Sequence, residues 1–342
     1  MAEQASKMRQ EINEIPIAVD RLLSDGNDAI QETAERIRNI NIRSLLSVAR
    51  GSSDHACTYL KYASELQLGL PMASVGPSVA SVYGARLQAR DMLCLSVSQS
   101  GQSPDIVRMT EGLADSGAFT VAITNDTGSP LAHASHAILP IHAGPELSVA
   151  ATKTFVTSLV TGLWLIAELK GDEEILRAIH TLPEFLDQAK DCDWSEAAAA
   201  ATGKSLYTLG RGPSWAISNE AALKFKEVCQ IHAESYSSAE VLHGPVSIVE
   251  QAFPVIAFAA ADPAEHALLE VADNLSGMGA RVFVTSDKAE KAKCLPSVRT
   301  GHWITDPIAA IVSFYSMVER IAATAGIDPD APRHLKKVTE TV

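Results

Sequence analysis

The stretch MLCLSVSQSGQSPD (residues 92–105) combines the signals for a strand, a loop and the start of a helix. Largely apolar residues at 92–97 are followed by glycine and small hydroxyl residues at 98–103. Ser103 is suited to cap a following helix, and Pro104 fits its first position, because the missing proline N–H is not needed there.

Short apolar runs of the same kind occur on both sides of this stretch, and helical stretches separate them. The runs cover residues 45–49, 72–75, 92–97, 119–124 and 137–141. This alternation is typical of a parallel sheet whose strands are joined by crossover helices. Before the first run, apolar residues at three- and four-residue steps predict a helical segment.

The second half of the chain repeats this pattern at an offset of about 161 residues. LLSVARGSS (45–53) aligns with LYTLGRGPS (206–214), and LCLSVSQSG (93–101) aligns with IAFAAADPA (256–264). The hydroxyl-rich loop is therefore present in the first copy and replaced in the second. We predict an α/β protein of two tandem doubly wound domains, each a parallel sheet flanked by helices in an αβα sandwich.

Four segments follow from this reading of the sequence. We assign an N-terminal helical segment, a first domain with phosphate-binding loops, a second domain with an acid–base helix, and a C-terminal tail that closes the active site. Their boundaries are 1–40, 41–190, 191–325 and 326–342.

Composition excludes several classes of protein. The net charge of −13 disfavours binding to nucleic acid or to an anionic membrane surface. Five single cysteines without a CxxC pair indicate neither a disulfide framework nor a zinc ribbon. The polar N-terminus and the short apolar stretch 159–169 predict neither a signal peptide nor a membrane span, so we expect a cytoplasmic protein.

Two hydroxyl-bearing loops follow neighbouring strands of the first predicted sheet. They are Gly51–Ser53 and Ser98–Ser103. Backbone N–H groups at helix N-termini, together with hydroxyls, can hold a phosphate without a lysine. Read singly, each loop is an ordinary turn. No dinucleotide, P-loop or HExxH motif occurs, and His133 and His136 make a weak HxxH, so we expect no metal and no cofactor.

The second half contains candidate acid–base residues. Glu220, Lys224 and Glu227 fall on one helical face, where they could form either a catalytic cluster or a solvated ion-pair stripe. His243 precedes a Gly-Pro turn and suits the rim of a cleft. Near the end, lysines 336–337 belong either to a frayed tail or to a tail that folds over an active site and supplies an amine.

Six segments, in this order, resemble motifs in the isomerase half of the glucosamine-6-phosphate synthases, a tandem sugar isomerase (SIS) family. They are ARGSSDHA, SVSQSGQSPD, AGPELSVAATKTF, LGRGPSWAISNEAALKFKEV, IHAESYSSAEVLHGP and DAPRHLKKVT. The resemblance runs from about residue 45 to the end of the chain. It implies two tandem SIS domains.

The resemblance also implies roles for residues that match the motifs. The sugar phosphate would be bound by one set of side chains, namely Ser53, Ser98, Gln99, Ser100 and Ser103, with Ser52 near the sugar. Glu220 and Lys224 would be supporting polar groups in the cleft.

Three further residues would take part in the chemistry. Glu227 would be the base that moves a proton between C1 and C2 of the sugar. His243 would assist ring opening and would come from the neighbouring subunit, which implies a homodimer with a shared active site. Lys337 matches the lysine that forms a Schiff base in the family.

The expected reaction follows from what is missing relative to the synthases. About 44 residues precede the first predicted strand, and Ala2 follows Met1, so we expect no glutaminase. The predicted activity is a deaminase that converts glucosamine 6-phosphate and water to fructose 6-phosphate and ammonia. Departures at Ala151 and Leu242 leave open a deglycase for fructosamine 6-phosphates, and a non-catalytic sugar-phosphate sensor is a third possibility.

Overall fold

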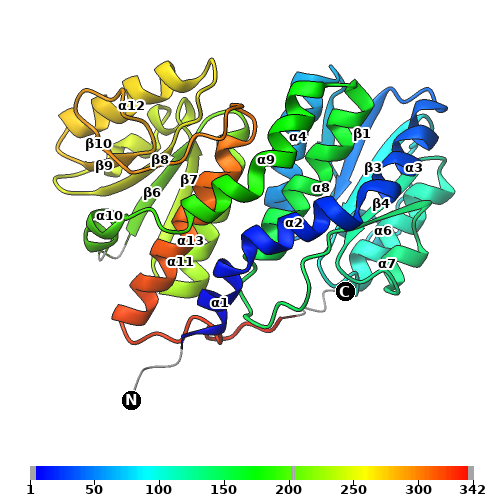
Figure 1. Cartoon of the computed structure of the whole chain (residues 1–342), viewed down its shortest axis with the longest axis horizontal. Helices are drawn as coiled ribbons and strands as arrows, with labels where there is room; N and C mark the ends of the chain where they lie inside the picture. Colours follow the sequence, from blue (N-terminus) through cyan, green and yellow to red (C-terminus); the bar gives the residue numbers. More distant parts are fainter. Residues whose placement is uncertain (1–4, 202, 204, 338–342) are drawn as a thin grey trace. The chain divides into compact units, whose positions relative to one another are not determined.

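The computed structural model describes residues 5–201, 203 and 205–337, and it divides into two compact units. The β1–β5 unit comprises residues 17–146, 153–180 and the chain from 335, and the β6–β10 unit comprises the chain to 16, 147–152 and 181–334. Each unit contains one sheet of five parallel strands with helices on its faces (Figure 1).

The β1–β5 unit has the strand order β2-β1-β3-β4-β5. Its strands are β1 (Ser44–Val48), β2 (Met72–Ser74), β3 (Met92–Val97), β4 (Phe119–Thr124) and β5 (Ala137–Pro140). Its helices are α3 (Asn27–Arg38), α4 (Ser52–Gln67), α5 (Ser78–Ser81), α6 (Pro104–Asp115), α7 (Pro130–His133) and α8 (Lys153–Lys170). Helices α2 (Ile15–Asp25) and α9 (Glu173–Ala189) begin in one unit and end in the other.

The β6–β10 unit has the order β7-β6-β8-β9-β10, which is the same order relative to the chain. Its strands are β6 (Ser205–Gly210), β7 (His232–Ser237), β8 (Pro254–Phe258), β9 (Arg281–Val284) and β10 (Lys293–Cys294). Its helices are α1 (Lys7–Asn13), α10 (Ser195–Ala200), α11 (Pro213–Cys229), α12 (Glu265–Gly277) and α13 (Asp306–Thr324), with short 3₁₀ turns η1 (Glu240–Leu242) and η2 (Pro245–Ile248). The predicted α/β class and tandem repeat are confirmed.

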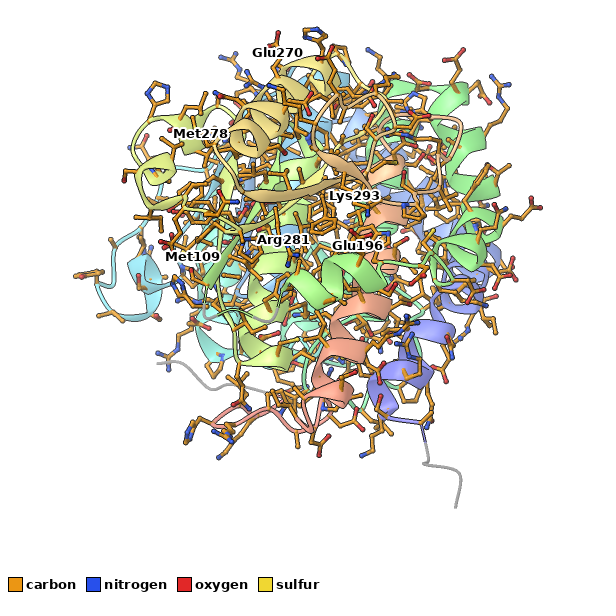
Figure 2. All side chains as sticks on the ribbon, turned by 90° about the vertical axis from the view of Figure 1, so that its left-hand side faces the viewer. Met109, Glu196, Glu270, Met278, Arg281 and Lys293 are labelled. Carbon is orange, nitrogen blue, oxygen red and sulfur yellow. The ribbon has the colours of Figure 1, made fainter. Side chains whose placement is uncertain are left out.

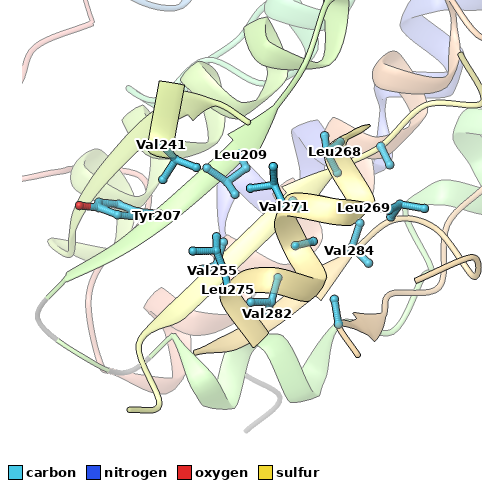
Figure 3. Packing of buried hydrophobic residues seen from close by; sticks show 14 of the residues in the cluster. Tyr207, Leu209, Val241, Val255, Leu268, Leu269, Val271, Leu275, Val282 and Val284 are labelled. Carbon is cyan, nitrogen blue, oxygen red and sulfur yellow. The ribbon is translucent and has the colours of Figure 1, made fainter. Parts of the chain in front are cut away.

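The central strands are buried on both faces, as expected for a parallel sheet covered by helices. In the β6–β10 unit, α12 covers one face, where Leu275 packs with Val255 and Val282 of the sheet (Figure 3). A second apolar layer contains the rings of Phe225 and Phe314, whose centroids lie 5.2 Å apart. These layers fix α11, the helix with the candidate acid–base residues.

A tight turn joins β6 to α11. Gly210 ends the strand, and a Cβ built on it would lie 2.3 Å from the Ser214 carbonyl oxygen. Gly212 then adopts a φ of +57°, which favours glycine. The turn therefore depends on residues without side chains.

No helix among the described residues is long and apolar enough to span a membrane. The longest apolar stretch expected from the sequence lies within α8, where residues from 153 to 167 are buried in the protein.

We expect Gly210→Ala to lower the free energy of unfolding by more than about 2 kcal/mol, because its new methyl group would meet main-chain atoms that cannot rotate away. Urea unfolding measures this change. Gly112→Ala in α6 is the matched control, since its methyl group would meet no atom within 4 Å. It should stabilise the protein by about 0.5–1 kcal/mol. Equal stability of the two variants would contradict this account of the turn.

Candidate functional site

The loop between β3 and α6 is held by hydrogen bonds of its own. Ser98 Oγ accepts from the Gly101 N–H at 3.2 Å, and Ser100 Oγ accepts from the Gln102 N–H at 3.3 Å. Gly101 has a φ of +61°, and a Cβ there would lie 2.1 Å from Ser129 Oγ. The loop therefore has one defined shape that requires glycine at its centre.

Ser103 occupies the N-cap position of α6 and Pro104 its first turn, as predicted, but the Ser103 side chain makes no capping hydrogen bond. The expectation that Ser103 caps this helix is wrong. The reason is that Asp105 Oδ1 already accepts from the Ile106 N–H at 2.9 Å, which is one of the amides that a cap would use. Arg50 Nη2 in turn lies 2.9 Å from Asp105 Oδ2.

The two predicted phosphate loops lie at the carboxyl ends of adjacent strands. β1 and β3 pair in parallel, with Val48 opposite Ser96. Gly51, with a φ of +56°, precedes α4, whose first residues are Ser52 and Ser53. The hydroxyl-bearing loops and the N-termini of α4 and α6 therefore lie at one edge of the sheet, where parallel α/β sheets bind ligands. Ser52, Ser53, Gln99, Ser100 and Ser103 are half-buried and Ser98 is buried.

The β6–β10 unit contains the acid–base cluster. Lys224 Nζ lies 2.9 Å from Glu220 Oε1 and 2.6 Å from Glu227 Oε2. Glu220 and Lys224 have fully buried side chains, whereas 21% of the Glu227 side chain is exposed. Tyr315 Oη, from α13, donates to Glu220 Oε1 at 3.2 Å. The solvated-stripe interpretation is therefore wrong for Glu220 and Lys224.

The electrostatics of this cluster keep Lys224 charged. Burial alone would lower the pKa of Lys224, but the carboxylates of Glu220 and Glu227 more than offset burial and raise it. An exposed pair provides a contrast: Glu196 and Lys293 meet at the surface of the same unit (Figure 2), where an ion pair contributes little stability. The buried cluster is thus a fixed array in which Lys224 orients Glu227.

His243 follows the turn η1 and is exposed. Its main-chain N–H donates to the Glu240 carbonyl oxygen at 2.9 Å. Gly244, with a φ of +135°, makes the next turn possible. The imidazole is therefore presented at the surface of its unit.

Lys337 has a partner that the sequence does not reveal. Its Nζ lies 2.7 Å from Glu146 Oε2. The buried Glu146 carboxylate also accepts from the N–H and the hydroxyl of Thr154, at 3.1 and 2.7 Å. The tail is thus bonded as far as Lys337, in contrast to the frayed alternative. The rest of the predicted tail, residues 338–342, lies outside the described residues.

The candidate residues divide between the units. The β1–β5 unit contains the serine loops, Glu146 and Lys337, and the β6–β10 unit contains the acid–base cluster and His243. Across the described ranges, no group of three or more His, Cys, Asp or Glu side chains is arranged to hold a metal ion. The chemistry offered is hydroxyl and amide donors, carboxylates, an imidazole and an amine.

Comparison with known proteins identifies the family. A sequence profile of the SIS domain matches residues 40–167 and residues 201–325, one match in each repeat. The chain belongs to the SIS-domain family. Among curated relatives of this SIS-domain protein, the glutamine–fructose-6-phosphate aminotransferase of Sulfurisphaera tokodaii is 33% identical over 96% of this chain. The chain spans about half the length of such relatives, 56% in this case.

Solved structures are also similar. A protein from Silicibacter pomeroyi, described as a candidate phosphosugar isomerase, is 58% identical with a TM-score of 0.93, covering 95% of this chain and all of that one. The glucosamine-6-phosphate deaminase of Thermotoga maritima is 22% identical with a TM-score of 0.77, covering 98% of this chain and all of that one. At this lower identity the likeness shows the fold alone.

Replacing Lys224 by methionine removes the cation from between Glu220 and Glu227. We expect K224M to lower the free energy of unfolding by about 3–5 kcal/mol, the usual cost of leaving a buried charge without its partner. Urea unfolding measures the loss. K226M, at an exposed position of the same helix, should change stability by less than about 0.5 kcal/mol. A K224M protein as stable as K226M would contradict the assigned ion-pair geometry.

Proposed function

We propose that this SIS-domain protein is a phosphosugar isomerase that deaminates glucosamine 6-phosphate, giving fructose 6-phosphate and ammonia. The observation that supports this proposal most is the buried Glu220–Lys224–Glu227 cluster. A protein that only binds a sugar phosphate has no need for an oriented carboxylate held by a buried cation. The serine loops of the β1–β5 unit offer hydroxyl and N–H donors for a phosphate.

The phosphate is bound by hydroxyl and main-chain N–H groups at the edge of the first sheet. Ser53, Ser98, Ser100 and Ser103 supply hydroxyls, Gln99 supplies an amide, and α4 and α6 present their first N–H groups. Ser52 lies closer to the sugar. Because the Ser103 hydroxyl makes no helix cap, it is available to a ligand.

Glu227 transfers the proton in the proposed reaction. It removes the proton from C2 of the opened amino sugar, and the electron pair forms an enolamine. Return of the proton to C1 gives an imine at C2, and water adds to this imine to release ammonia and fructose 6-phosphate. Lys224 holds one Glu227 oxygen at 2.6 Å, so the carboxylate keeps its orientation during both transfers.

Two further residues assist. His243 promotes ring opening of the sugar, and its exposed position is consistent with a site shared between two subunits of a homodimer. Lys337, held by Glu146, positions the substrate or, as a free amine, adds to the C2 imine and displaces ammonia; water then hydrolyses the resulting Schiff base to fructose 6-phosphate and restores the amine.

A related activity fits the same residues. A deglycase for fructosamine 6-phosphates would use the same phosphate loops and the same base, and would release an amine or amino acid in place of ammonia. Glucosamine 6-phosphate is the first substrate to assay, because the deaminase reaction needs only water and the one sugar phosphate.

The deciding experiment incubates the purified protein with glucosamine 6-phosphate in the absence of glutamine. We expect fructose 6-phosphate and ammonia in equal amounts. Glu227→Gln should lower kcat by about 10²-fold or more, the usual contribution of a general base, while calorimetric binding of fructose 6-phosphate persists. Bound fructose 6-phosphate with no turnover of either substrate class would overturn the enzyme assignment in favour of a sensor.

The phosphate loop gives a separate prediction. Ser103→Ala should leave stability unchanged, because no cap is lost, and should raise the KM for glucosamine 6-phosphate by about 10-fold or more through the lost bond to a charged group. Ser116→Ala, at the other end of α6, is the control and should leave KM unchanged. Steady-state kinetics and urea unfolding measure both quantities. An unchanged KM in S103A would remove Ser103 from the phosphate site.

A further inference from the structure

Helix α1 belongs to the N-terminal segment for which the sequence indicates no function, yet it is firmly held in the β6–β10 unit. It packs against α13 (Figure 1). Arg9 Nε lies 2.9 Å from Glu319 Oε2, and Arg9 Nη2 donates to the Ser316 carbonyl oxygen at 2.8 Å. These contacts give α1 a fixed place against the longest helix of its unit.

The beginning of the C-terminal tail is bonded to the first turn of α1. Asp330 Oδ2 accepts from the Lys7 N–H and Asp330 Oδ1 from the Met8 N–H, both at 2.8 Å. The Asp330 carbonyl oxygen accepts from the Val149 N–H at 3.3 Å. Bonds from helix N–H groups to a carboxylate are among the stronger hydrogen bonds in proteins. Asp330 therefore fixes the tail a few residues before Lys337.

The same helix also holds the segment that follows Glu146. The Glu11 carboxylate accepts from the N–H groups of Leu147 and Ser148, and its side chain is buried. Leu147 is covalently joined to Glu146, the partner of Lys337. Thus α1 bonds the two chain segments that lead to the two members of the Glu146–Lys337 ion pair.

We propose that Glu11 and Asp330 are positioning residues for the Glu146–Lys337 pair, with α1 as the clamp on both segments. This inference deepens the proposed function, and its kinetic readout rests on that function. Neither residue belongs to the proposed substrate-binding or catalytic groups. Glu11 fixes the residues directly after Glu146, and Asp330 fixes the chain seven residues before Lys337.

The first test uses the full chain and does not depend on activity. In D330A, tryptic cleavage after Arg333 and Lys336, and hydrogen exchange of residues 331–337, should be at least about 10-fold faster than in wild type. E11A should accelerate exchange of the Leu147 and Ser148 amides similarly. The conservative variants D330N and E11Q retain an acceptor oxygen and should restore much of the protection.

The matched control is D172A. Asp172 Oδ1 caps α9 by accepting from the N–H groups of Glu174 and Ile175, both at 3.1 Å. The D172A variant therefore loses the same kind of bond in another part of the chain. In D172A, tryptic cleavage and hydrogen exchange of the tail should be as slow as in wild type. Tail protection unchanged in D330A, or lost equally in D172A, overturns the proposal.

The second test is kinetic. With glucosamine 6-phosphate, D330A should lower kcat by about 10-fold and change KM less than threefold, because the phosphate loops are untouched. A loosened tail with unchanged kcat overturns the positioning role. If wild type turns over no amino-sugar phosphate, the proposed function fails, while cleavage and exchange still decide whether α1 clamps the tail.

Discussion

The parallel order of the five-stranded sheet is the constraint that brings the candidate phosphate loops to one edge. In a parallel sheet every strand ends at the same edge, and each crossover helix begins there with its first N–H groups unpaired. Because β1 and β3 are neighbours in the first sheet, α4 and α6 begin next to each other. A phosphate can be held at this edge without a lysine, and the strand order, rather than any single residue, determines where.

The acid–base cluster is subject to a different constraint, the cost of burying charge. Lys224 is fully buried and retains its charge only because two carboxylates lie within 3 Å of its ammonium. Replacing such a cluster with apolar side chains of similar size often leaves a protein equally stable or more stable. The stability of the fold therefore does not explain why these three charged side chains are present. A need to orient the Glu227 carboxylate does explain them. Tyr315 extends the cluster to α13 and ties its geometry to the core.

Local patterns located the strands but missed long-range partners. The apolar runs at 92–97 and 119–124 coincide with β3 and β4, because buried parallel strands are continuous apolar segments. The edge strand β10 is two exposed residues and leaves no such pattern. Ser103 lies at the expected helix boundary. Its hydroxyl makes no capping bond because the Asp105 carboxylate already binds one of the helix N–H groups, and residue propensities do not include this competition.

The partnership of Glu146 with Lys337 joins residues 191 positions apart in the chain. Glu146 is one acidic residue among 41 acidic positions, and nothing in its neighbourhood marks it as buried or paired. Its only signal was its place inside a segment that matches the family. Long-range ion pairs of this kind are determined by tertiary packing. A sequence motif can therefore identify the lysine, but it does not identify the partner of the lysine.

The two repeats have diverged in a way that the structure explains. In the second copy, Asp262 replaces the hydroxyl loop, and its Oδ1 accepts from the Ala264 N–H at 2.9 Å, just before α12. Asp262 is half-buried, and this burial raises the pKa of its carboxyl group. A phosphate brought to this edge would meet a carboxylate already bonded to the helix, and like charges disfavour each other there. Serine hydroxyls in the first copy impose no such repulsion. The two copies thus differ at this edge: the first presents hydroxyl and N–H donors suited to an anion, and the second presents its own carboxylate. The candidate acid–base helix lies in the second copy.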